Sequence, residues 1–127
     1  IHEYQVLFLG KMLNNNIINE FRNASCLVCP SIFEPWGLVI NEALSAGLPV
    51  ITTKNVGASY DLVKDKNTGM IASNMQDFGN KMLELYNNND LLIDFSKNAS
   101  DLMLNYWNYN LYEKCLLEAI EKINKCK

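Results

Sequence analysis

Four short runs of apolar and β-branched residues occur in the first 72 residues, each bounded by glycine, proline or a polar loop. Continuous runs of four or five such residues are typical of parallel strands that are buried on both faces. Glycine and proline at their ends mark positions where a strand can start or stop. We therefore predict four strands, at residues 6–9, 26–29, 49–53 and 68–72.

Between and after these runs, apolar residues recur at intervals of three and four. This spacing places them along one face of an α-helix, so each helix should lay an apolar stripe on a core. Gly47 follows one of these segments, as expected at the C-terminal end of a helix. We predict helices at residues 17–24, 37–46, 57–63, 77–87, 91–105 and 111–124.

The alternation of strands and helices with short links predicts an α/β fold, a Rossmann-like parallel sheet flanked by helices and joined by right-handed crossovers. The first strand expected of such a sheet is missing, and strand-type sequence begins within about five residues of Ile1. We therefore expect residues 1–127 to be most of one domain of a longer polypeptide.

Composition excludes several classes of protein. Hydrophobic residues make up 49% of the 127 residues, which disfavours disorder. The 11 Lys and Arg against 14 Asp and Glu give a net charge of −3, which argues against a nucleic-acid partner. No apolar run approaches the roughly 18 residues of a membrane span, and no signal peptide is apparent.

The four cysteines of the chain are expected to be small, buried apolar side chains. Cys26 and Cys29 have the spacing of a zinc half-site, but on a strand they point to opposite faces. Cys115 and Cys126 lack such spacing, and His2 is the single histidine. We predict no metal site, and free thiols indicate a reducing, cytoplasmic compartment.

The loop at residues 30–37 follows a predicted strand and leads directly into a predicted helix. In open parallel sheets, ligands bind beyond the carboxyl ends of the strands. Two prolines stiffen this loop, and Gly37 lets the backbone approach a ligand closely. The unpaired N–H groups of Gly37, Leu38 and Val39 suit a phosphate or pyrophosphate.

Two acids, Glu34 and Glu42, flank this helix start. A carboxylate beside an anion site is unfavourable unless it accepts hydrogen bonds from neutral hydroxyl groups, which ribose and hexose supply. A sugar nucleotide carries ribose, pyrophosphate and sugar in line, which fits the order acid, amides, acid. The alternative is that Glu42 is a solvated acid favoured by the helix dipole and Glu34 an ordinary loop residue.

This segment resembles the signature of the family 4 retaining glycosyltransferases, in which two glutamates are separated by seven residues. Here these are Glu34 and Glu42. The flanking segments are also similar. Residues 6–10 resemble the family's strand-glycine segment, and residues 30–31 resemble its Pro-Ser before the first acid. Residues 57–63 resemble its glycine turn and short helix, residues 67–69 its Asn-x-Gly turn, and residues 47–51 the sheet segment after the signature.

The resemblance implies the C-terminal, donor-binding domain of a GT-B fold, with the acceptor-binding N-terminal domain absent from this chain. It assigns Glu34 as the catalytic residue, a carboxylate beside the transferred sugar, and Glu42 as the ligand of the ribose hydroxyls. The amides of the Gly37 segment, which includes Leu38 and Val39, would hold the phosphates and sugar. The loop of Gly10 and Met12 would face the nucleobase.

The implied reaction is hexosyl transfer from a nucleotide sugar with retention of anomeric configuration and no metal or other cofactor. The acceptor would be a glycan or glycolipid in bacterial polysaccharide or glycolipid synthesis, and the full-length protein would be cytoplasmic or peripheral at the cytoplasmic face of the membrane. The family's Arg and Lys that neutralise the leaving diphosphate lie upstream of this segment. We therefore expect residues 1–127 alone to be inactive.

Two other functions stay open. One is a non-catalytic nucleotide-binding or receiver-like α/β module, although the residues that directly follow the predicted strands are Gly10, Pro30, Lys54 and Ser73, without the Asp that a receiver requires. The other keeps the fold and changes the reaction to that of a nucleotide-sugar epimerase or a phosphorylase.

Overall fold

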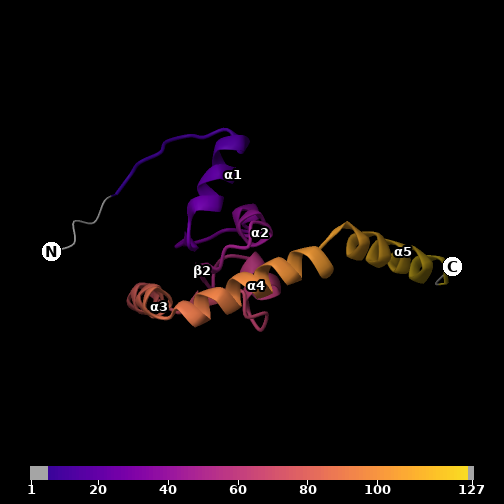
Figure 1. Cartoon of the computed structure of the whole chain (residues 1–127). Helices are drawn as coiled ribbons and strands as arrows, with labels where there is room; N and C mark the ends of the chain where they lie inside the picture. Colours follow the sequence, from indigo (N-terminus) through magenta and orange to yellow (C-terminus); the bar gives the residue numbers. More distant parts are fainter. Residues whose placement is uncertain (1–5, 126–127) are drawn as a thin grey trace.

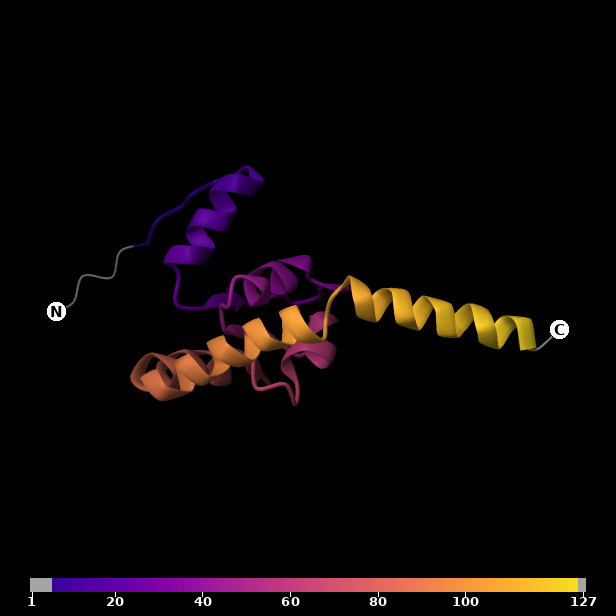
Figure 2. The ribbon, with the colours of Figure 1, turned by 45° about the vertical axis from the view of Figure 1, so that its right-hand side comes forward.

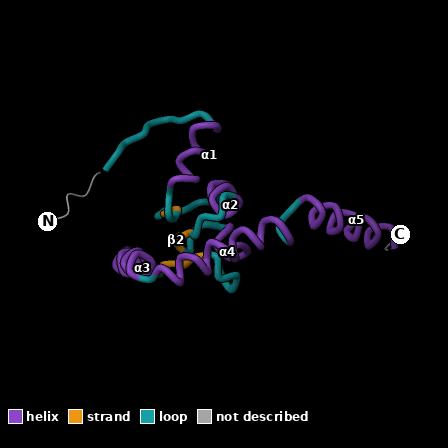
Figure 3. The backbone as a smooth tube through the Cα atoms, viewed as in Figure 1, coloured by secondary structure: helices purple, strands orange, loops and turns teal. Residues whose placement is uncertain are grey.

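The computed structural model describes residues 6–125 and contains one parallel sheet with the strand order β1-β2-β3. Helices cover both faces of this sheet (Figures 1 and 3). The strands are β1 (Leu27–Cys29), β2 (Val50–Thr53) and β3 (Gly69–Ala72). The helices are α1 (Asn14–Asn23), α2 (Leu38–Ser45), the π-helical η1 (Ser59–Val63), α3 (Met75–Asn87), α4 (Asn89–Asn105) and α5 (Tyr109–Lys125).

The central strand β2 divides the core into two halves. Val50 packs into a cluster with α2, and its neighbour Ile51 packs into a second cluster with α3. Because successive strand residues point to opposite faces, α2 and α3 lie on opposite sides of the sheet. Helix α4 contributes Ala99 to the first cluster and Phe95 to the second. The continuous apolar run thus predicted the burial of β2 correctly.

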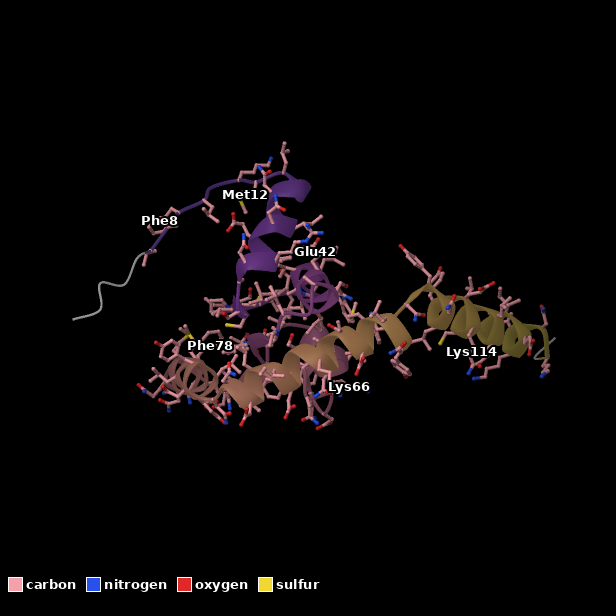
Figure 4. The ribbon with its side chains drawn as sticks, in the orientation of Figure 1. Phe8, Met12, Glu42, Lys66, Phe78 and Lys114 are labelled. Carbon is pink, nitrogen blue, oxygen red and sulfur yellow. The ribbon has the colours of Figure 1, made fainter. Side chains whose placement is uncertain are left out.

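The prediction of a strand at residues 6–9 is wrong. This segment is extended but pairs with no strand among the described residues, and Phe8 is 95% exposed. Figure 4 shows Phe8 on the segment that leads to α1, away from the sheet. A strand forms only where a neighbouring strand pairs its backbone groups and helices cover its faces. Neither condition is met here.

Helix α5 also departs from the expectation that every helix lays its apolar stripe on the core. It contributes no buried residue and extends away from the sheet and its helices (Figure 2). The α-helical periodicity of this segment is confirmed, but its stripe faces solvent in the described chain. Ile123 at its far end is 61% exposed.

The remaining predicted strands and helices are confirmed, with boundaries shifted by a few residues, and residues 59–63 are π-helical. The expectation that the cysteines are buried holds for Cys29 and partly for Cys26, whose pKa is raised by burial. It is wrong for Cys115, which is exposed on the unpacked α5. Cys126 lies outside the described residues. In the described part of the chain, none of the helices is long and apolar enough to cross a membrane.

Candidate functional site

The loops that follow β1 and β2 are joined by backbone hydrogen bonds at the carboxyl edge of the sheet. The N–H of Glu34 donates to the carbonyl of Asn55 at 3.0 Å, and the N–H of Gly57 donates to the carbonyl of Glu34 at 3.0 Å. The N–H of Ala58 donates to the carbonyl of Trp36 at 2.8 Å. These bonds form a short parallel bridge and fix the backbone of the first loop.

Two glycines make this close approach of the loops feasible. A Cβ on Gly57 would collide with the carbonyl oxygen of Pro35. Gly37 adopts the left-handed conformation with φ of +92°. A Cβ on Gly37 would lie 2.9 Å from Cγ1 of Val56 and 3.2 Å from Cγ of Glu34. Both positions therefore require glycine.

Gly37 is the N-cap of α2, and no side chain caps this helix. The first amide that donates into the helix is that of Ile40, to the carbonyl of Gly37 at 2.9 Å. The N–H groups of Gly37, Leu38 and Val39 have no acceptor among the described residues. Leu38 is 70% exposed and Val39 is also exposed, whereas Gly37 is buried, so the helix end meets solvent at Leu38 and Val39. It is suited to an anionic ligand.

The two acids of the site differ in exposure. Glu34 is half-buried in the loop, whereas Glu42 is exposed on α2, about 6 Å along the helix axis from Leu38. Glu42 lines a groove of about 590 Å³ between α1 and α2, opposite Arg22. Figure 4 places Glu42 on α2 near α1. Among residues 6–125, the one ion pair joins Lys81 to Asp77. Neither Glu34 nor Glu42 is paired with a cation there, so both carboxylates are available to a ligand.

Two partners of the loop could not be predicted from the sequence. The indole N–H of Trp36 donates to Oδ1 of Asn41 at 2.9 Å, and the ring of Trp36 stacks on that of Trp107, with centroids 6.0 Å apart. The one sequence signal for the stack is that the chain contains two tryptophans. Their contact joins distant parts of the chain and could not be read from spacing.

One continuous segment, the loop and the first turns of α2, carries five of the predicted site residues: Glu34, Gly37, Leu38, Val39 and Glu42. Gly10 and Met12 are not brought to it. They lie before α1, and Figure 4 shows Met12 at the end of α1 that points away from α2. Their proposed role at a nucleobase stays a prediction.

Residues 2–102 match the family model described as glycosyl transferases group 1. This chain belongs to the glycosyl transferases group 1 family. An uncharacterized glycosyltransferase of Methanocaldococcus jannaschii is 32% identical over 111 residues, which cover 86% of this chain and 30% of that protein. The chain thus spans about a third of the length of this relative.

Solved glycosyltransferase structures share the fold of this group 1 chain. WaaG, a glycosyltransferase involved in lipopolysaccharide biosynthesis, aligns with a TM-score of 0.65 and 27% identity over 79% of this chain and 28% of WaaG. The C-terminal domain of LpcC, a group 1 protein of Francisella tularensis, aligns with a TM-score of 0.67 and 26% identity over 81% of this chain and 52% of that one. The chain belongs to the C-terminal domain of group 1 glycosyltransferases with the GT-B fold.

Proposed function

We propose that the full-length protein is a hexosyltransferase that uses a nucleotide-sugar donor, retains the anomeric configuration, and binds this donor through the present domain. The observation that carries the proposal is the uncapped N-terminal end of α2, which lies between two acids at the carboxyl edge of a parallel sheet. Ligands of open parallel sheets bind at this edge, and the family membership supplies the reaction class.

The donor would lie along the loop and the start of α2. The N–H groups of Gly37, Leu38 and Val39 would donate to the phosphate oxygens, where the helix dipole also favours negative charge. Glu42 would accept hydrogen bonds from the ribose hydroxyls. Glu34 would accept hydrogen bonds from the hydroxyls of the transferred sugar and orient it. Gly10 and Met12 would face the base.

In the proposed reaction, the bond between the anomeric carbon and the phosphate oxygen breaks, and the acceptor oxygen bonds to the same face of that carbon. The acceptor hydroxyl proton passes to the departing phosphate oxygen, so charge and atoms balance. The amides at the start of α2 stabilise the negative charge that grows on the leaving diphosphate. The donor is a substrate, and the proposal requires no metal or other cofactor.

The acceptor belongs to the proposal as a glycan or glycolipid, bound by an N-terminal domain outside this chain. The involvement of WaaG in lipopolysaccharide biosynthesis supports a bacterial glycolipid or polysaccharide. The proposed location is the cytoplasm or the cytoplasmic face of the membrane. Because the acceptor domain and the cations for the leaving group lie elsewhere in this proposal, residues 1–127 alone should not turn over a donor.

The test is a donor screen of the full-length protein with UDP-, GDP- and ADP-sugars, in which hydrolysis and transfer are followed. Glu42→Gln should raise the donor KM about tenfold or more, since a hydrogen bond to a charged group contributes about 1.5–3 kcal/mol. Glu34→Gln should chiefly lower kcat. The matched control is Glu84→Gln, an exposed acid on α3. Unchanged kinetics in both site variants would overturn the proposal.

A further inference from the structure

The turn between α4 and α5 contacts two other segments of the chain through adjacent aromatic residues. The Trp107 ring stacks on Trp36 with centroids 6.0 Å apart and planes inclined by 16°. Nζ of Lys66 lies 5.6 Å from the centre of the Tyr106 ring. The turn itself is anchored, because the N–H of Trp107 donates to the carbonyl of Leu102 at 2.7 Å. Trp107 is thus presented to the site loop from a fixed backbone.

Trp36, the partner in this stack, is held at three points. Its ring contacts Trp107, its indole N–H donates to Asn41 of α2, and its carbonyl accepts from Ala58. The next residue, Gly37, has the left-handed conformation that starts α2. A change in the backbone angles of Trp36 would therefore change the direction of the amides at the start of this helix.

The stack lies at the edge of the core, where both tryptophans pack against the buried cluster that includes Val50 and Leu44. Both tryptophans are half-buried, and Trp107 and Asn41 line an open groove of about 690 Å³. A half-buried aromatic pair removes less apolar area from water than a core pair does, so global stability depends on it less. Its geometric effect on the loop is direct, since Trp36 lies between Glu34 and Gly37.

We infer that Trp107 is a positioning residue, which holds Trp36 and through it sets the orientation of Glu34 and of the amides that start α2. The effect on catalysis rests on the proposed function of this site. The effect on the loop does not, because it follows from the contacts alone.

The first test is hydrogen exchange of the full-length protein and of Trp107→Ala. The amides of Glu34, Gly57 and Ala58 bridge the two loops and should exchange about two- to tenfold faster in the variant, the factor expected for loss of an aromatic pair. The sheet amides of Leu27 and Val50, which donate to Pro49 and Thr68, should not change. The inference would be overturned if the loop and sheet amides exchanged faster by the same factor, or if neither set exchanged faster.

Two further variants separate positioning from packing. Trp107→Phe keeps a ring on Trp36 and should restore the exchange rates of the loop amides. Tyr86→Ala removes an aromatic ring that is 86% exposed on α3 and should leave them unchanged. Failure of the phenylalanine variant to restore protection would contradict a role for the stack.

The second test uses the donor identified for the full-length protein. Trp107→Ala should lower kcat/KM by about the same two- to tenfold factor, and Trp107→Phe should recover it. Faster loop exchange with unchanged kcat/KM would refute the link to catalysis. If the full-length protein turns over no sugar nucleotide, the proposed function fails, and the exchange pattern alone decides the positioning role.

Discussion

The substitution Gly37→Ala tests the loop geometry on which the donor site depends. Gly37 has φ of +92°, and an added Cβ would lie 2.9 Å from Cγ1 of Val56. The same Cβ would lie 3.2 Å from Cγ of Glu34. The change therefore imposes both backbone strain and a steric conflict on the residue that begins α2.

The two costs can be estimated separately. A non-glycine residue in the left-handed region costs about 1–2 kcal/mol, and overpacking by one methyl group in a rigid setting costs about 1–3 kcal/mol. Together they lower the free energy of unfolding by about 2–5 kcal/mol. Val56 is fully buried and cannot move aside cheaply, which favours the upper part of this range.

The loss of unfolding free energy is measured by unfolding in urea, monitored by circular dichroism. Two other glycine-to-alanine variants serve as controls. Gly10→Ala has a similar positive φ of +65° but no atom within 4 Å of the new Cβ. It should cost less than about 1 kcal/mol, because the exposed segment around it can relax. Gly79→Ala, in the interior of α3 with open space around it, should stabilise by about 0.5–1 kcal/mol.

A Gly37→Ala variant with the same unfolding free energy as the Gly10→Ala variant would contradict the predicted strain at Gly37. It would mean that the start of α2 accommodates a side chain, and that the left-handed turn is not what fixes the amides. A folded Gly37→Ala variant should also bind donor more weakly, since relief of the strain moves those amides.

Further predictions concern the scaffold. Leu44→Ala, at a fully buried position on α2, should lower the unfolding free energy by about 2–5 kcal/mol in the same urea assay, and a loss below about 1 kcal/mol would contradict the packing. The Ser73 N–H and hydroxyl donate to Asp77 at the start of α3 and lower its carboxyl pKa. This stabilisation is present above the unfolded pKa of about 3.9 and is lost as pH falls through the lower folded pKa. Between roughly pH 5 and pH 2, the window of an Asp with a lowered pKa, the unfolding free energy of Asp77→Asn should therefore fall less than that of the parent. Parallel curves of unfolding free energy against pH for the two proteins would refute the assignment.

Local sequence signals predicted a strand correctly where the neighbouring strands and the covering helices belong to the described chain. The apolar run of β2 correctly predicted a buried strand, because strands on both sides and helices on both faces are present. The run at residues 6–9 has the same character but no neighbouring strand in the described chain. Its failure shows that strand formation depends on a partner that spacing does not encode.

The same distinction applies to the helices and to the site. The periodicity of α5 predicted a helix but not the surface that covers its stripe. At the site, Gly37 and the two acids could be predicted because loop, glycine and helix start are adjacent in sequence. The stack of Trp36 on Trp107 and the bridge of Glu34 to Val56 could not. Both join distant segments and depend on the packing of α4 and the sheet.

In the proposed site, the donor phosphates bind the amides at the start of α2. The most direct measurement is the amide spectrum of the full-length protein labelled with ¹⁵N-glycine, during titration with the nucleoside diphosphate of the preferred donor. We expect a large, saturable shift of the Gly37 signal and no shift of Gly79, which lies on α3 across the sheet from α2. Saturation by the nucleotide with Gly37 unchanged would contradict it.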